Sequence, residues 1–240
     1  PLLVVHMSAA GTLAALRRAQ SDREGGGPAA LGEVCVHHLF ADDAAYRADE
    51  DAALGAICSP PLRPAGHGAA LLAGLADGAI DLLSTDHCEF ALATKRNAAP
   101  GGFMKVPNGC GGVGERLVLS HTMAVCEGRL DPWRWQQAFA ELPAALMGLG
   151  ARKGRLAPGF DADIVLFDPE ARYTWQPAAG SDVAGSLWDG KPAVGRVTDV
   201  WLRGIPVVRD GALCPEQPGG VFLPRFGFTP RLARFAAPPE

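Results

Sequence analysis

The sequence lacks the features that mark membrane, secreted and nucleic-acid-binding proteins. None of its apolar runs approaches the roughly 20 residues that cross a bilayer, and the chain as given does not open on a charged-then-apolar leader. Its six cysteines include no CxxC pair and are too sparse for a disulfide-stapled secreted domain. The net charge is −4, and no dense basic stripe is present. These absences predict a cytoplasmic protein with neither a membrane nor a nucleic-acid partner.

The residues that are present suffice for a sizeable core, since 48% of the 240 residues are hydrophobic. Apolar runs of the kind that form buried parallel strands occupy residues 2–5, 33–40 and 79–83. Helical periodicity alternates with them, over residues 13–20 with Thr12 as a cap, 68–77 before Gly78, 115–127 and 133–149. This alternation predicts an α/β fold, a parallel sheet or barrel with helices outside.

Proline and glycine mark the connections between these elements. Asp131-Pro132 has the pattern of a helix start, and Pro143 is expected to bend or split the helix that follows. Residues 59–61 (Ser-Pro-Pro) predict a structured loop. Residues 95–114 are rich in Gly, Pro and Asn, and such a long irregular segment is more often a functional loop than filler.

The last third of the chain changes character. A short strand is predicted over residues 161–169, and two strands joined by Arg203-Gly204 over residues 197–211. The Pro- and Gly-rich end is expected to be an extended arm that wraps a partner subunit or the parent domain. The predicted organisation is an α/β unit over residues 1–150, a smaller β unit over 151–214, and a tail over 215–240.

Two predicted strand ends carry side chains that can bind a metal, His6 and Asp86. The carboxyl ends of parallel strands are where such folds assemble their sites, and a neutral imidazole with a carboxylate oxygen suits zinc. His37-His38 is discounted as a metal pair, because neighbouring residues of a strand point to opposite faces. The remaining histidines are expected in loops or at the surface, with His87 close enough to Asp86 to tune it: His67, His87 and His121.

Several motifs, in this order, resemble the cyclic amidohydrolases, and among them the dihydropyrimidinase/hydantoinase family. They are His6-x-Ser8, Glu33-x-Cys35, Ser59-Pro60-Pro61-Leu62-Arg63, Thr85-Asp86-His87-Cys88-x-Phe90 and Phe103-x-Lys105-Val106-Pro107-Asn108-Gly109. Residues 152–165 and 202–211 are similar to strands of this family's closing β-sandwich. The Ser-Pro-Pro-Leu-Arg and Pro-Asn-Gly motifs favour this branch over dihydroorotases and allantoinases.

The resemblance implies the last strands of a (β/α)₈ barrel, followed by the C-terminal part of a small β-sandwich, in a homotetramer. It implies two zinc ions, bridged by a carboxylated lysine and a hydroxide, with His6 and Asp86 as ligands at the ends of strands six and eight. Ser59 and Asn108 match positions that hold a cyclic imide, largely through backbone groups. Zinc-bound hydroxide would attack the ring carbonyl, and Asp86 would carry the proton to the leaving nitrogen, giving an N-carbamoyl amino acid.

The departures from the family concern residues that this sequence does not contain. The chain begins inside a predicted strand, so an upstream portion is expected to be absent. The family's His-x-His, bridging lysine, further histidine and oxyanion-binding tyrosine would belong there, and the chain alone is expected to be inactive. Gly114 stands where the family usually has an acidic residue. A non-catalytic scaffold subunit, a truncated product that does not fold alone, and an allantoinase or dihydroorotase type of enzyme remain alternatives.

Overall fold

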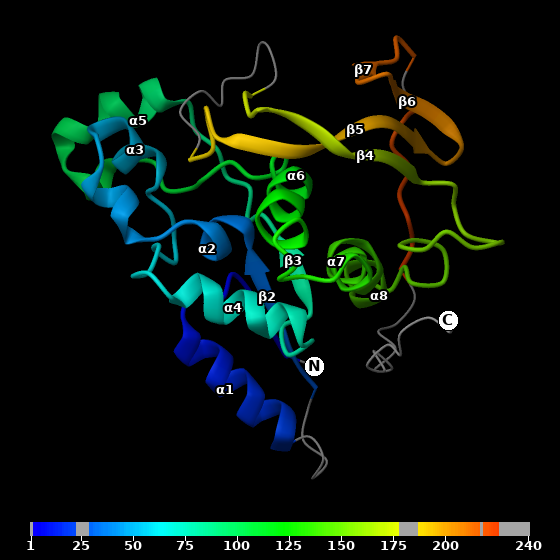
Figure 1. The fold of residues 1–240 in the computed structure, drawn as a ribbon, viewed down its shortest axis with the longest axis horizontal. Coiled ribbons are helices and arrows are strands. Elements are labelled where there is room, and N and C mark those ends of the chain that lie inside the picture. Colours follow the sequence, from blue (N-terminus) through cyan, green and yellow to red (C-terminus); the bar gives the residue numbers. More distant parts are fainter. Residues whose placement is uncertain (1, 23–28, 178–186, 217, 226–240) are drawn as a thin grey trace.

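A computed structural model describes residues 2–22, 29–177, 187–216 and 218–225 (Figure 1). The strands are β1 (Leu2–Val4), β2 (Ala30–Cys35), β3 (Leu82–Ser84), β4 (Ile164–Thr174), β5 (Pro192–Leu202), β6 (Ile205–Arg209) and β7 (Ala212–Leu213). The α-helices are α1 (Ala10–Ser21), α2 (Val36–Phe40), α3 (Glu50–Gly55), α4 (His67–Ala76), α5 (Leu92–Ala98), α6 (Arg116–Ser120), α7 (Pro132–Gln136) and α8 (Leu142–Leu146). Short 3₁₀ segments are η2 (Asp43–Arg47), η3 (Ala99–Gly101) and η4 (Phe103–Lys105), and π segments are η5 (His121–Val125) and η6 (Gln137–Glu141).

The first sheet is parallel, with the order β1-β2-β3, as the alternation of strands and helices predicted. Its middle strand β2 is buried along most of its length, which explains its apolar sequence. At the carboxyl end, Cys35 of β2 lies opposite Ser84 of β3. This edge, with the segments that leave it, carries the predicted ligands His6 and Asp86.

The strand predicted over residues 33–40 is wrong in its second half. The chain leaves β2 at Cys35 and turns directly into α2, so that His37 and His38 lie on a helix. Residues 34–39 are all buried, and a segment buried on every side has no periodicity that separates a strand from a helix. The strand predicted over 79–83 is also shorter, because β3 is confined to Leu82–Ser84.

The helix ends follow the predicted signals in part. The Asp131 carboxylate accepts bonds from the backbone N–H groups of Trp133 and Arg134, and Gly78 follows α4 with a φ of 83°, both as predicted. Thr12 is not a cap, because α1 begins at Ala10. Before Pro143, which lacks an N–H group, the helix shifts to the π pattern of η6 and resumes as α8.

Helices α1, α2 and α4 and the π segments η5 and η6 pack against the parallel sheet and enclose one apolar core (Figure 1). The core residues are Met7, Leu13, Leu16, Ala30, Val34, Val36, Leu39, Leu71, Leu72, Leu75, Ala79, Ile80, Leu83, Ala124, Leu130 and Ala138. The irregular segment predicted over residues 95–114 is more ordered than expected, because it includes part of α5 and two 3₁₀ turns. In the described ranges, the helices are all too short or too polar to cross a membrane.

The second sheet is antiparallel, with the order β4-β5-β6-β7. The hairpin at Arg203-Gly204 is confirmed, and both residues have positive φ angles, 52° and 80°. The strands β4 and β5 are longer than predicted, at 11 residues each. Most of the predicted arm after residue 215 lies outside the described residues.

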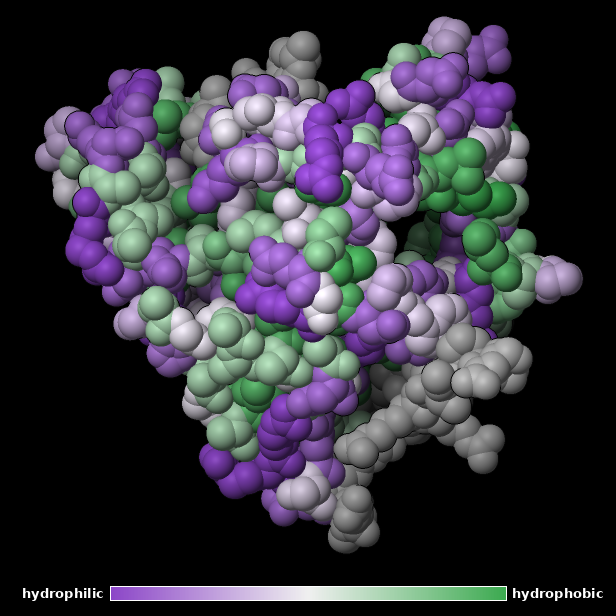
Figure 2. All heavy atoms as spheres, viewed as in Figure 1, coloured by the Kyte–Doolittle hydropathy of each residue, from purple (hydrophilic) through white to green (hydrophobic). Residues whose placement is uncertain are grey.

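The antiparallel sheet presents large apolar side chains to the surface. Figure 2 shows apolar residues gathered beside the β-hairpins, and the exposed side chains there are Val165, Leu166, Ile205 and Leu213. Val165 and Leu166 are neighbours on β4 and point to opposite faces, so apolar side chains are exposed on both faces of this sheet.

Asp81, just before β3, holds a buried carboxylate that makes stability depend on pH. Its Oδ2 accepts a bond of 2.8 Å from the backbone N–H of Gly32, and burial raises the pKa of Asp81 to about 6. A carboxyl whose pKa is higher in the folded chain contributes stability below its unfolded pKa near 3.8, and this contribution is lost as pH rises towards 6.

Asp81→Asn is therefore expected to stabilise the chain at pH 7 by about 1–3 kcal/mol, because the amide stays neutral and its oxygen can accept the same bond. No gain is expected at pH 4, where Asp81 is largely protonated in the fold. Urea unfolding at pH 4, 5.5 and 7 measures the difference. The control is Asp210→Asn in an exposed turn. An equal gain at all three pH values would contradict the role of burial.

Candidate active site

The two predicted metal ligands occupy unusual backbone conformations at the same edge of the parallel sheet. His6 follows β1 with a φ of 37°, and Asp86 follows β3 with a φ of 44°. Among the described residues, the other non-glycine residues with positive φ are Arg203 and Asp210, both in hairpin turns. Such conformations cost free energy and cluster at sites where the surroundings hold a side chain in place. Outside the hairpin turns, positive φ angles among the described non-glycine residues thus occur at the two residues that the sequence predicts as metal ligands.

Glu33 of the middle strand ties the two outer strand ends together. Its Oε1 accepts bonds from the Ser84 hydroxyl at 2.7 Å and from the backbone N–H of His6 at 3.4 Å. The Cys35 sulfur lies 3.3 Å from the Ser84 Oγ. A carboxylate that bonds to both neighbouring strands fixes their relative position where the chain turns towards His6 and Asp86. Glu33 belongs to the motif Glu33-x-Cys35, but no local pattern in the sequence indicates this role.

The loops of Ser59 and Asn108, both exposed residues, lie side by side. The N–H of Gly109 donates to the carbonyl of Ile57 at 2.9 Å. Beneath them the buried Lys95 ammonium donates to three backbone carbonyls, Leu54 at 3.0 Å, Ile57 at 3.4 Å and Gly109 at 2.7 Å. One buried cation therefore joins both predicted substrate loops. A single lysine in an irregular segment gave no signal of this role in the sequence.

The Asn108 loop is also joined to the segment that carries Asp86. The N–H of Cys88 donates to the carbonyl of Cys110 at 3.0 Å. Gly109 has a φ of 154°, and a Cβ there would lie 2.1 Å from the Cys88 carbonyl oxygen. Only glycine allows this approach. The structure thus places Asn108 beside the segment of Asp86, as well as beside the loop of Ser59.

His87 has partners other than Asp86. Its Nδ1 accepts from the N–H of Gly112 at 3.1 Å, and its Nε2 lies 3.2 Å from the Glu89 carboxylate. Among the described contacts, none joins the His87 ring to the Asp86 carboxylate. The predicted tuning of Asp86 by His87 is therefore not supported by a contact, and His87 instead holds the loop that follows Asn108.

The other histidines have structural roles that the sequence did not reveal. His121 was expected in a loop or at the surface, but it is buried, and its Nδ1 donates to the carbonyl of Val194 at 2.8 Å. That bond joins the helical unit to β5. His67 begins α4, and its Nδ1 accepts from the N–H of Ala10 at 3.0 Å.

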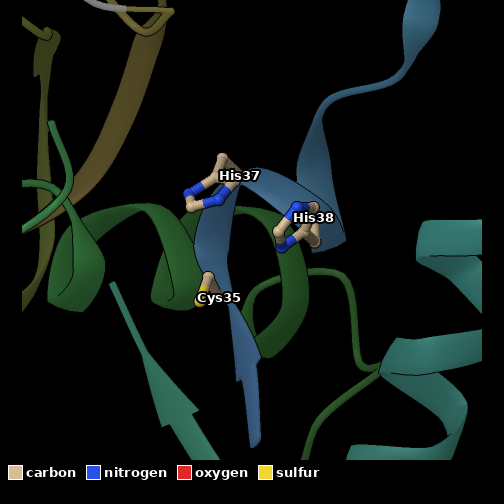
Figure 3. Close-up of side chains that lie close together, drawn as sticks. All are labelled: Cys35, His37 and His38. Carbon is tan, nitrogen blue, oxygen red and sulfur yellow. The ribbon is translucent and has the colours of Figure 1, made fainter. Parts of the chain in front are cut away.

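Cys35, His37 and His38 form a compact group, which corrects the expectation that the two imidazoles point apart. The helical turn after β2 brings ligand atoms of all three residues within 4.8 Å of one another (Figure 3). Burial lowers the pKa of His37 to about 3, and the neighbouring His38 and His6 act in the same direction. Burial raises the pKa of Cys35 to about 12. The group lies close to the strand ends of His6 and Asp86, since the charge of Asp86 also acts on Cys35.

An apolar cavity of about 420 Å³ opens beside the Ser59 loop. Its lining is Tyr46, Glu50, Ala53, Leu54, Ile57, Cys58, Pro61 and Phe103. This composition favours a small apolar group rather than a charged one.

The sequence matches the amidohydrolase family over residues 29–204, which covers β2 to β5 and the candidate site except His6. The chain belongs to the amidohydrolase family. Enzymes of this family are generally metal-dependent, which agrees with the chemistry of an imidazole and a carboxylate at strand ends.

Named relatives of this amidohydrolase chain are hydantoinases. It is 37% identical over 226 residues to the D-hydantoinase of Streptomyces coelicolor, covering 94% of this chain and 47% of that protein. It is 36% identical over 231 residues to a D-phenylhydantoinase of Escherichia coli, covering 96% of this chain and 49% of that protein. The solved D-hydantoinase of Bacillus sp. AR9 superposes with a TM-score of 0.81 at 31% identity, covering 89% and 46% of the two chains. The chain spans about half the length of the curated relatives it matches.

Proposed function

We propose that the protein to which this chain belongs hydrolyses a cyclic amide, a dihydropyrimidine or a 5-substituted hydantoin, to an N-carbamoyl amino acid. The observation that carries the proposal is the pair His6 and Asp86, held in left-handed backbone conformations at one sheet edge. The loops of Ser59 and Asn108 meet beside that edge, and the named relatives are hydantoinases.

The chain supplies the last strands of a (β/α)₈ barrel and part of a β-sandwich in this proposal. Three parallel strands with helices, followed by an antiparallel sheet, are compatible with it. An antiparallel sheet with exposed apolar side chains is compatible with one sheet of a sandwich. The homotetramer stays a prediction, which size-exclusion chromatography of the intact protein tests.

The residues present fit part of a zinc site. Among the described contacts, neither the His6 imidazole nor the Asp86 carboxylate is hydrogen-bonded to another residue, so both retain ligand atoms. We propose that they hold zinc together with a carboxylated lysine and histidines from upstream residues. Zinc, when bound, supplies a Lewis acid that polarises a carbonyl and lowers the pKa of water to about 7.

Groups of the protein carry out proton transfer and substrate binding. Asp86 accepts the proton of the attacking water and then donates it to the ring nitrogen that leaves, so one carboxylate serves as base and then as acid. Backbone groups at Ser59 and Asn108 hold the imide, and the bonds to Lys95 keep the two loops at a fixed separation. Positioning of this kind removes part of the entropic barrier of the reaction.

Ring opening by the intact protein tests the proposal. We expect turnover of dihydrouracil or of 5-phenylhydantoin, with the N-carbamoyl product detected by chromatography, and loss of turnover after chelation of the metal. The 240-residue chain alone is expected to show no measurable turnover, because it holds only two of the proposed ligands. An intact, metal-loaded protein that opens neither ring would favour the scaffold alternative, and turnover of dihydroorotate or allantoin instead would favour those enzyme types.

A further inference from the structure

The group Cys35, His37 and His38 has no part in the proposed hydrolysis, and its burial requires an explanation. The three residues are 0%, 1% and 3% exposed. Both ring nitrogens of His37 and the Nδ1 of His38 are buried with no hydrogen-bond partner among the described residues. An unpaired buried polar atom costs about 1–3 kcal/mol. A cation bound beside the Cys35 thiol would pair two of these three atoms, one from each imidazole.

The bonds around the group leave suitable lone pairs for a cation. The Nε2 of His38 lies 2.9 Å from the carbonyl oxygen of Pro60, so Nε2 carries the proton and donates it. In a neutral ring, Nδ1 is then left as an unprotonated donor atom. Metal-binding histidines commonly have this arrangement, in which the second nitrogen donates to a carbonyl. His37 can present either nitrogen, since neither is occupied within the described part of the chain.

We propose that Cys35, His37 and His38 form a second metal site, which binds a divalent transition-metal ion such as Zn²⁺ separately from His6 and Asp86. One thiolate, two imidazoles and a water as the fourth ligand make a tetrahedral set that zinc accepts. Binding replaces the thiol proton of Cys35, which passes to solvent, and leaves a site charge of +1. The nearby Glu33 carboxylate, 3.9 Å from the sulfur, offsets that charge.

The spacing of the three residues is close to what an ion needs. Zinc–sulfur and zinc–nitrogen distances of about 2.3 and 2.0 Å set ligand atoms roughly 3.3–3.7 Å apart in a tetrahedron. The ligand atoms here lie within 4.8 Å of one another, so small side-chain rotations close the site. All three side chains come from one short stretch at the junction of β2 and α2 (Figure 3). The ion would therefore fasten that junction, and through His38 the Ser59 loop.

Cobalt(II) titration of the metal-free 240-residue chain tests the proposal, because thiolate-to-cobalt charge transfer absorbs in the near ultraviolet. We expect about one equivalent to bind with this band, and Zn²⁺ to displace it. Cys35→Ser should remove the band, and His37→Gln and His38→Gln should each weaken cobalt binding at least tenfold. The control Cys126→Ser, which removes an exposed cysteine outside the group, should retain the band, as should the double variant His6→Asn, Asp86→Asn.

X-ray absorption of the zinc-loaded wild-type chain is a second test, and it does not depend on whether the variants fold. A shell with one sulfur at about 2.3 Å and two nitrogens is expected. A shell of oxygen and nitrogen alone, or a cobalt band that survives Cys35→Ser, would overturn the proposal. Failure of ring opening in the intact protein would leave it standing, because this site does not depend on the proposed hydrolysis.

Discussion

Replacing Asp86 with asparagine is expected to lower turnover of the intact protein by at least about a thousandfold while leaving the fold in place. A carboxylate that works as general base and acid contributes about 10²–10⁴ in rate, and the amide also loses the negative charge that a metal ligand supplies. Asp86 is exposed in this chain and carries no hydrogen bond to another described residue, so little packing is lost. Asparagine also tolerates the positive φ of 44° at this position.

The measurement is the rate of ring opening, with circular dichroism and thermal unfolding to verify the fold. Asp210→Asn removes an exposed carboxylate at a φ of 51°, far along the chain in a hairpin turn, and should retain full activity. Turnover near that of the wild type would remove Asp86 from the mechanism.

The parallel sheet and the helices could be predicted because the spacing of apolar residues along the sequence follows which side chains are buried. The runs at residues 2–5 and 79–83 overlap β1 and β3, and the helix over 68–77 is nearly that of α4. The strand predicted over 33–40 failed in its second half because residues 34–39 are all buried, so the change from strand to helix after Cys35 left no change in pattern. A pair of histidines predicted to point apart therefore lies on one helical turn with the cysteine before it.

The site residues could be predicted only where the local sequence, such as the end of a strand, marks them. His6 and Asp86 stood at strand ends, and the structure confirms that position for both. Glu33 and Lys95 act through contacts between residues 14 to 51 positions apart, and such pairings depend on the fold rather than on local sequence. His121 was misplaced for the same reason, since its partner Val194 is 73 residues away. Only the structure shows that Glu33, Lys95 and His121 join strands, loops and helices that lie far apart in the sequence.

Lys95→Met is expected to destabilise the chain by about 2–4 kcal/mol, the largest effect on stability among these predictions. Lys95, a residue of α5, is 2% exposed, and its ammonium donates to the carbonyls of Leu54, Ile57 and Gly109. Burial lowers the pKa of Lys95, so removal of the charge returns part of its desolvation cost. Loss of the charged donor outweighs that gain, because a hydrogen bond to a charged group contributes about 1.5–3 kcal/mol. The carbonyls of Leu54 and Ile57 keep backbone donors, whereas the Gly109 carbonyl keeps none among the described contacts. Methionine fills a similar volume, so the loss reports the bonds rather than a cavity.

The same change separates a purely structural lysine from one that positions the substrate loops. Once Lys95 no longer joins Ile57 to Gly109, the loops of Ser59 and Asn108 can move apart. In the intact protein we therefore expect KM to rise about tenfold or more, with kcat changed less, since the groups at Asp86 are untouched. Lys105→Met, at an exposed lysine of η4, is the control and should change neither stability nor KM. A loss of stability with unchanged KM would confine Lys95 to the fold, and unchanged stability would show that water replaces the ammonium at the three carbonyls.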